Sequence, residues 1–251
     1  MTWSEGSADV FDAMLRGVRV LAGESAVRVS RESGCVVVES EAADGSKRRA
    51  SFDRVVMACD APAALGMLGD SVGPLVRFLL RRITYVDDCE GADFLQGWIH
   101  RDESVLSAEA AKRVREMSNC VSVARNGDVV NTFVLSSWIP KVLGLRLESS
   151  EKPFLVTYGK VPIANPLQQV SFRFAHPMLC FSNLLASFLL RFVHCPTQIA
   201  FCGSWTTPGN GHDLSFCSGL AAAHALGAAY PFAGDRELEE EFARVRNVLG
   251  Q

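Results

Sequence analysis

A segment near the end of the chain, residues 199–230, most constrains what this sequence can form. It reads IAFCGSWTTPGNGHDLSFCSGLAAAHALGAAY. The run Ile199–Cys202 predicts a strand, the glycine-rich stretch after it predicts a loop, and Ser218-Gly219 then opens a predicted helix that ends at Leu226. The first turn of such a helix offers free backbone N–H groups and a positive dipole end. The pattern therefore predicts either a site for an anion or a polar ring edge, or a helix packed closely on a sheet through Ala and Gly.

The composition excludes several classes of protein. In 251 residues, 25 Lys and Arg stand against 28 Asp and Glu, and this net charge of −3 gives no electrostatic basis for binding nucleic acid. Hydrophobic residues make up 48% of the chain, enough for a large core, which excludes disorder as the main state. Polar residues interrupt the most apolar window, residues 178–195, so we expect no transmembrane segment.

The cysteines and histidines do not form a recognisable site in the sequence. The eight cysteines are scattered without a CxxC pair, which indicates reduced thiols and an intracellular, cytoplasmic protein. Cys202 and Cys217 flank the glycine-rich loop, and we interpret them as buried, inert thiols. The sequence contains no HExxH and no Cys/His pair with zinc-site spacing, so no metal is predicted.

The chain predicts two kinds of structure along its length. The chain opens with a short helix that begins at Ser7. A small antiparallel meander, a more apolar strand and a helix through Leu68 follow it. The expected strands there are Val18–Leu21, Ala26–Ser30, Cys35–Ser40, Arg48–Phe52 and Val55–Ala58. Further along we expect an antiparallel sheet with strands at 119–124, 129–135, 154–158 and 169–174, flanked by helices at 75–83, 108–116 and 182–193. The run 236–249 predicts a charged amphipathic helix at the periphery.

Within residues 199–230, His212 is followed six positions later by Ser218-Gly219-Leu220. This spacing resembles the C-terminal flavin-binding signature of FAD-dependent amine oxidase-like oxidoreductases, in the branch described as NAD/FAD-binding proteins. Asp213 stands where that branch has Glu. Weaker matches to the family run in order along the rest of the chain, at Gly6-Ser7, Ser25-Ala26-Val27, Phe52–Ala58, Lys152–Thr157 and His176-Pro177.

The resemblance implies an α+β or α/β fold, in which a partial FAD-binding (Rossmann-like) domain is interrupted by an antiparallel-sheet substrate domain. Residues 1–68, with the meander, and 196–251, with the C-terminal helix, would belong to the FAD-binding domain, and residues 69–195 to the substrate domain.

The resemblance also implies roles for single residues. The backbone of Val27 would pair with the adenine edge, and Ala58 would lie against the adenosine and diphosphate. The turn at Gly203 and Ser204 would approach the ribityl-pyrophosphate. Cofactor contacts near the flavin would come from His212, Ser218, Gly219 and Leu220, the last three presenting a helix N-terminus to the pyrimidine edge. His212 would lie on the loop beside the flavin as the catalytic candidate, against the alternative of a structural or solvated histidine.

The sequence departs from the family in one large feature. Members begin with a strand, a Gly-x-Gly-x-x-Gly turn and a helix, whereas the Gly-x-Gly in this sequence, Gly209-Asn210-Gly211, lies near the end. The chain resembles the C-terminal portion of a longer oxidoreductase, so we expect it to bind non-covalent FAD weakly by itself. A missing N-terminal half or a partner chain would complete it.

Two functions follow as hypotheses. The first is an FAD-dependent oxidoreductase that transfers hydride from a substrate C–H bond to the flavin, in a pocket lined by Phe133, Trp138, Phe172 and Phe174, unless these aromatics are plain core. Relatives beside or fused to cyclopropane fatty-acid synthases imply a lipid-like small molecule as one substrate class. The second is a catalytically inactive remnant that acts as a binding or scaffold module through exposed sheet edges.

Overall fold

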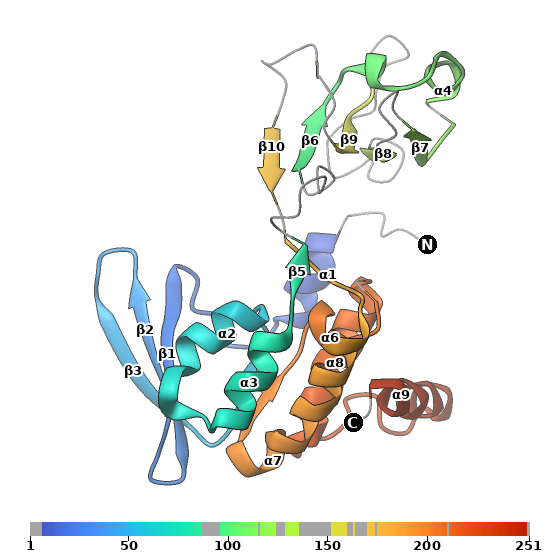
Figure 1. The fold of residues 1–251 in the computed structure, drawn as a ribbon. Helices are drawn as coiled ribbons and strands as arrows, with labels where there is room; N and C mark the ends of the chain where they lie inside the picture. Colours follow the sequence, from blue (N-terminus) through green and yellow to red (C-terminus); the bar gives the residue numbers. More distant parts are fainter. Residues whose placement is uncertain are drawn as a thin grey trace. The chain divides into compact units, whose positions relative to one another are not determined.

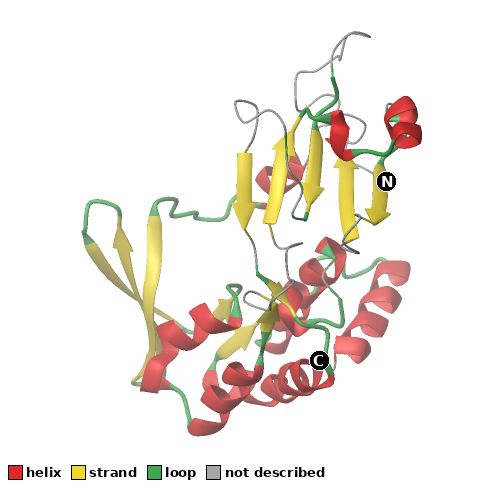
Figure 2. Cartoon of the chain, turned by 45° about the horizontal axis from the view of Figure 1, so that its top comes forward, coloured by secondary structure: helices red, strands yellow, loops and turns green. Residues whose placement is uncertain are grey.

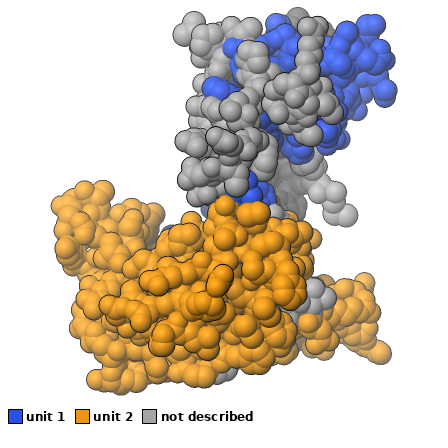
Figure 3. Space-filling model, in the orientation of Figure 1, with its two compact units in different colours: residues 1–20, 86–176 blue, residues 21–85, 177–251 orange. Residues whose placement is uncertain are grey.

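The chain divides into two compact units (Figure 3). The computed structural model describes residues 7–86, 96–114, 116–123, 129–135, 152–159, 163, 170–173, 175–209 and 211–249. Unit 1 comprises Met1–Val20 and Val86–His176, and unit 2 comprises Leu21–Tyr85 and Pro177–Gln251. The boundaries between these units differ from the predicted domain boundaries after residues 68 and 195. As a result, two helices expected in the substrate domain, at 74–82 and 181–190, lie in unit 2.

Unit 2 begins with the predicted antiparallel meander, in the order β1-β2-β3. Its strands are β1 (Glu24–Glu32), β2 (Cys35–Ala42) and β3 (Lys47–Phe52). Ser33 and Gly34 connect β1 to β2 with φ of 48° and 86°, the left-handed pair that a tight hairpin requires. The strand expected at Val18–Leu21 is wrong. The glycines at 17 and 23, with φ of 80° and 83°, turn the chain on both sides of this stretch, and it pairs with no described strand.

The centre of unit 2 is a parallel pair of short strands, β4 (Val55–Met57) and β12 (Ile199–Phe201). Successive residues of a strand face opposite sides, and β12 shows this clearly. Ile199 and Phe201 enter the main core together with helices α2 (Ala61–Leu68), α3 (Pro74–Arg82) and α6 (Phe181–Leu190). Ala200 instead packs with Ala222 of helix α8 (His212–Ala225). Helices therefore cover both faces of the pair (Figure 1).

The remaining elements complete unit 2. The predicted peripheral amphipathic helix is confirmed as α9 (Arg236–Leu249), and it packs on α8 where Phe242 meets Ala221. The ring of Phe242 also stacks on Tyr230, with 4.3 Å between centroids. The others are α7 (His194–Thr197) and the 3-10 turns η1 (Gly69–Ser71), η5 (Arg191–Val193) and η6 (Ser204–Thr206).

Unit 1 contains the predicted antiparallel sheet, with five strands in the order β10-β6-β9-β8-β7 (Figure 2), of which β6 was not expected from the sequence. The strands are β6 (Gln96–His100), β7 (Asn119–Val123), β8 (Val129–Val134), β9 (Leu155–Tyr158) and β10 (Val170–Arg173). One face buries Val134 and Leu155 against Val114, which follows α4 (Ala108–Arg113). Helix α1 (Ser7–Met14) and the turn η3 (Glu103–Val105) also belong to this unit. The short strands β5 (Tyr85–Val86) and β11 (His176–Pro177) form a separate two-stranded sheet.

The fold class expected from the sequence is confirmed: a parallel strand pair with helices on both faces, interrupted by an antiparallel sheet. Among the described helices, none has both the length and the apolar character needed to cross a membrane.

Candidate functional site

The carboxyl ends of β4 and β12 lie at the same edge of the parallel pair. Phe201 stands opposite Met57 in the register, so the residues after each strand, Ala58 and Cys202, emerge side by side. The N–H of Cys202 donates to the carbonyl of Met57 across this edge, at 3.1 Å. In sheets with helices on both faces, ligands bind outside the carboxyl ends of parallel strands. This edge is therefore the candidate site.

The turn after β12 requires glycine and is held by a buried serine. Gly203 has φ of 125°, a conformation that side chains with a Cβ rarely adopt, and its N–H donates to Ser218 Oγ at 2.9 Å. The Ser218 hydroxyl in turn donates to the carbonyl of Ser215 at 2.8 Å. Ser218 is fully buried. It acts as a brace that links α8 to the turn.

The two strand ends are tied together by Trp205, which the sequence reasoning did not select. Its indole Nε1–H donates to the carbonyl of Cys59 at 3.0 Å, and its ring packs against Phe201. The side chain is 5% exposed. The signal in the sequence that could have indicated this role is a tryptophan two residues after the glycine that ends a strand.

Helix α2 follows β4 and closes its own N-terminus. Asp60 caps the helix, because its Oδ1 accepts from the N–H of Ala63 at 2.7 Å. The N–H of Ala61 donates to the hydroxyl of Tyr85 at 3.1 Å, and Pro62 has no N–H. These bonds occupy the amide groups that would otherwise bind an anion. Burial raises the pKa of the Tyr85 phenol, so it stays protonated at neutral pH.

Helix α8 begins at His212, six residues before the predicted start at Ser218-Gly219, and this expectation is wrong. Its positive end therefore lies at His212–Leu214, and His212 is the first residue of the helix, not a loop residue. The glycine-rich loop ends in Gly211, which occupies the N-cap position without a side-chain acceptor. The carboxylate of Asp213 folds toward Gly211 in this first turn. His212 and Asp213 are both exposed.

The small residues of α8 have two different surroundings. Ala222 is fully buried against Ala200 and Cys202 of the β12 segment, so the helix packs on the sheet through alanine. Gly219 has no heavy atom within 4 Å of the position of an added Cβ. Close packing with the described residues thus does not explain this glycine. Leu220 faces α9, where it packs beside the contact of Ala221 with Phe242.

Val27 and Ala58, the two predicted contacts of the adenosine half, are both exposed. The register of β1 and β2 steps from Ala26 opposite Ser40 to Arg28 opposite Glu39. Val27 is therefore the extra residue of a β-bulge and has no residue opposite it, which turns its backbone away from the regular ladder.

The thiols at the strand ends are not poised to react. Burial raises the pKa of Cys202 to about 11, and it also raises the pKa of Cys59. Thiols with such pKa values are protonated at neutral pH and are poor nucleophiles, as the sequence predicted for Cys202. Cys217 is only half-buried, unlike the expectation of a buried thiol, and partial burial also raises its pKa. Among the described residues, no group of three or more His, Cys, Asp or Glu side chains is arranged to hold a metal.

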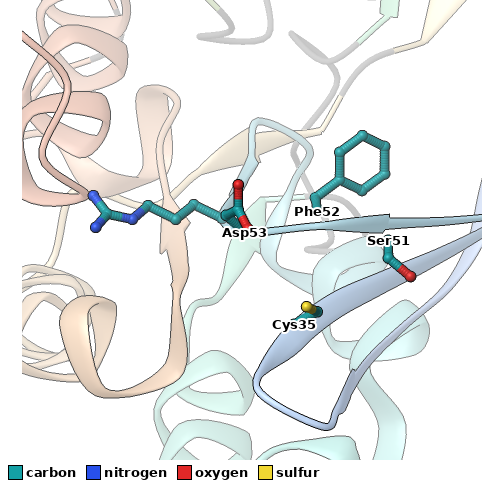
Figure 4. Close-up of a pocket in the computed structure, with 5 residues that line it drawn as sticks. Cys35, Ser51, Phe52 and Asp53 are labelled. Carbon is teal, nitrogen blue, oxygen red and sulfur yellow. The ribbon is translucent and has the colours of Figure 1, made fainter.

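A hollow of about 670 Å³ lies away from this edge, at the end of β3 (Figure 4). Cys35, Ser51, Phe52, Asp53 and Arg54 line it. Phe52 is 45% exposed and the hollow opens to solvent. None of the predicted site residues lines it.

Of the four aromatic residues predicted to line the pocket, the structure describes the side chain of one, which lies in the sheet of unit 1. Phe133 is half-buried and meets Tyr158 edge to face, with ring centroids 5.8 Å apart. Trp138 and Phe174 lie outside the described residues, and only the backbone of Phe172 is described.

The opposite face of that sheet buries a polar chain that the sequence did not indicate. The N–H of Asp102 donates to His100 Nδ1, so Nε2 carries the proton and donates to Thr157 Oγ1 at 2.8 Å. Thr157 Oγ1 lies 2.9 Å from Thr132 Oγ1. Burial lowers the pKa of His100, which is neutral at pH 7. The pattern is that of a structural histidine.

Comparison with known proteins returned solved structures only. No protein-family model and no curated protein matches the sequence. CabE, an aromatic hydroxylase from angucycline biosynthesis, is 14% identical over 97% of this chain and 47% of its own, with a TM-score of 0.41. OxyS anhydrotetracycline hydroxylase from Streptomyces rimosus is 8% identical, over 95% and 44%, with a TM-score of 0.40. The flavin-dependent monooxygenase PieE, in complex with FAD and substrate, is 13% identical, over 91% and 47%, with a TM-score of 0.33. The chain thus spans less than half the length of each of these proteins, and such scores do not assign it to a family.

Proposed function

We propose that unit 2 is part of an FAD-binding domain and that the chain works within a flavin-dependent oxidoreductase of the amine oxidase-like kind. The observation that carries this proposal is the glycine turn at the carboxyl end of β12. Its positive φ is fixed by the buried Ser218, and no Cβ separates its backbone from a ligand. A turn of this kind lets the phosphates of a dinucleotide approach the main chain closely.

Other features of the site fit the same cofactor. The first turn of α8 supplies a positive helix end, which favours the anionic diphosphate or the electron-rich edge of a flavin. The open space beside Gly219 leaves room for a ligand. The bulge at Val27 interrupts the regular ladder of β1 and β2 at the residue proposed to meet the adenine edge, and Ala58, proposed to lie against the adenosine, is exposed.

The corrected start of α8 changes two of the proposed roles. Ser218 becomes a positioning residue that holds Gly203, and the amides near His212 replace those of Ser218–Leu220 as the helix end that faces the flavin. Ser204, which follows the turn, remains in the role proposed for the diphosphate. His212 remains the catalytic candidate.

When bound, FAD would supply the acceptor for a hydride taken from a substrate C–H bond. The chain would bind and orient the substrate and exclude water. We propose a small, lipid-like molecule as substrate, held against the half-buried side of the unit 1 sheet that carries Phe133.

We expect weak binding of FAD by this chain alone, because the sequence has no Gly-x-Gly-x-x-Gly turn after a strand to hold the diphosphate. An N-terminal half or a partner chain that supplies such a turn would complete the site.

The test is an equilibrium titration of FAD fluorescence with the purified chain, together with visible spectra from 350 to 550 nm before and after gel filtration with added FAD. We expect saturable binding that Gly203→Ala weakens by about tenfold or more, since alanine at this φ strains the turn. Gly34→Ala is the matched control, because Gly34 has a similarly positive φ of 86° in a hairpin turn outside the site. Absence of saturable binding, or equal loss in both variants, would contradict the proposal.

A further inference from the structure

Helix α6 exposes apolar side chains where a helix on a protein surface ordinarily exposes polar ones. Its buried stripe consists of Asn183, Ala186 and Leu190. The other side exposes Phe181 to 79% and Phe188 to 41%, with Leu184 and Leu185 between them. Phe192, in the 3-10 turn that follows, is 62% exposed. A row of leucine and phenylalanine in water marks a surface that something covers.

Helix α3 continues this surface. It packs beside α6 (Figure 1), and both helices bury their inner stripes in the core that includes Met57 of β4 and Phe201 of β12. Their outer stripes therefore lie on the same side of this helix layer. The outer stripe of α3 consists of Leu75 and Phe78, exposed to 58% and 51%, followed by the exposed Arg81 and Arg82. We call the two outer stripes, with Phe192 and Arg191, the α3–α6 face.

The charges on this face are all positive. Neither helix contains Asp or Glu, and the sequence has none between Lys152 and His212. The nearby Asp70, which is exposed, pairs with Arg77 of α3. Among the ion pairs of the described residues, none involves Arg81, Arg82 or Arg191.

Two of these arginines lie over rings of the same face. The guanidinium carbon of Arg191 is 3.5 Å from the centroid of Phe188 and 4.6 Å from that of Phe192. That of Arg82 is 4.9 Å from the centroid of Phe78. Each pair keeps a cation in contact with an apolar ring, so this face offers positive charge and apolar surface together, as binding at an anionic membrane interface requires.

We propose that the α3–α6 face docks on an anionic phospholipid surface, with the phenylalanines in the interface and the arginines at the phosphates. A second copy of the chain fits this face less well. A symmetric contact would bring Arg81, Arg82 and Arg191 toward their own copies without a carboxylate on either helix, whereas anionic headgroups neutralise them. This proposal does not depend on the binding of FAD.

The experiment is co-sedimentation of the full chain with large vesicles of phosphatidylcholine alone and of phosphatidylcholine with phosphatidylserine. We expect binding to the anionic vesicles only, with weakening at high salt. Each arginine near an anionic surface contributes about a fivefold factor, so Arg81→Gln with Arg82→Gln should weaken binding about 25-fold. Phe181→Ser with Phe192→Ser should reduce it further, because both side chains are exposed and their loss leaves the core intact.

Matched controls change the same residue types elsewhere on unit 2. Arg28→Gln with Arg31→Gln removes two exposed cations from β1, and Phe232→Ser removes an exposed ring, and neither should alter binding. Circular dichroism confirms that each variant is folded. Equal binding to both vesicle types, no binding, or loss in the controls as large as in the α3–α6 variants would overturn the proposal. So would concentration-dependent dimers, seen by sedimentation, that disappear in Phe181→Ser with Phe192→Ser while vesicles do not bind.

Discussion

Replacing Ser218 by alanine tests whether the brace between α8 and the Gly203 turn holds the candidate site in shape. The hydroxyl accepts from the Gly203 N–H at 2.9 Å and donates to the Ser215 carbonyl at 2.8 Å, in a fully buried position. Its loss leaves the part-buried Gly203 N–H without its acceptor, and an unpaired donor removed from water costs about 1–3 kcal/mol. We expect the variant to lose about 2 kcal/mol of local stability.

The assay is amide hydrogen exchange followed by mass spectrometry, because it reports on β12 and α8 separately from unit 1. A loss of about 2 kcal/mol accelerates exchange about 30-fold in peptides that cover residues 199–225. Ser187→Ala is the matched control. Ser187 also donates to the carbonyl three residues before it, that of Leu184, but on the solvent side of α6. We expect a change within about 0.5 kcal/mol for this variant.

One outcome would refute the reasoning. If Ser218→Ala and Ser187→Ala accelerate exchange equally, the Gly203 bond contributes nothing to stability, and Ser218 does not fix the turn. FAD affinity is a second measurement: Ser218→Ala should weaken FAD binding, as Gly203→Ala should.

Two further predictions concern groups with shifted pKa values. Hydrogen bonds, led by that from Ser182, lower the pKa of Cys180, whereas burial raises the pKa of Cys59 and Cys202, so iodoacetamide at pH 7.5 should modify Cys180 before these two. Mass spectrometry of digested protein measures the order, and labelling of Cys202 before Cys180 would contradict it. Burial lowers the folded-state pKa of His100, so its contribution to stability is complete above the unfolded pKa of about 6.5 and is lost as pH falls from there through the folded pKa. The free energy of unfolding, measured in urea, should therefore fall more steeply with decreasing pH below about 6.5 for the unchanged chain than for His100→Gln. Parallel pH profiles of the two would show that His100 does not take up a proton on unfolding.

Much of the fold follows from local sequence signals. The meander needs alternating residues and glycines at the turns, and both are visible in the chain, so β1 to β3 could be expected from Ser33-Gly34 and Asp44-Gly45. The helix α9 follows from its own apolar and charged periodicity. Four of the five antiparallel strands of unit 1 could likewise be expected, but β6 and the order of the strands could not, because pairing joins segments far apart in sequence.

The failures share a physical cause. Val18–Leu21 has the residues of a strand, but a strand needs a partner. The stretch has a turn at each end, and no described strand pairs with it. The sequence near Ser218 has the residues of a helix start, but a serine there serves equally well inside a helix if a distant donor needs its oxygen. That donor, the Gly203 N–H, is fifteen residues away.

The sequence by itself therefore determined the hydrophobic periodicity of the helices and strands, the hairpin turns and the turn at Gly203. Each of these depends on a residue's own backbone preference and on its near neighbours. Only the tertiary structure decided where α8 begins, that Trp205 and Tyr85 belong to the site, and which helices share an exposed apolar face. These depend on which side chains meet across the core, and no local pattern encodes such meetings.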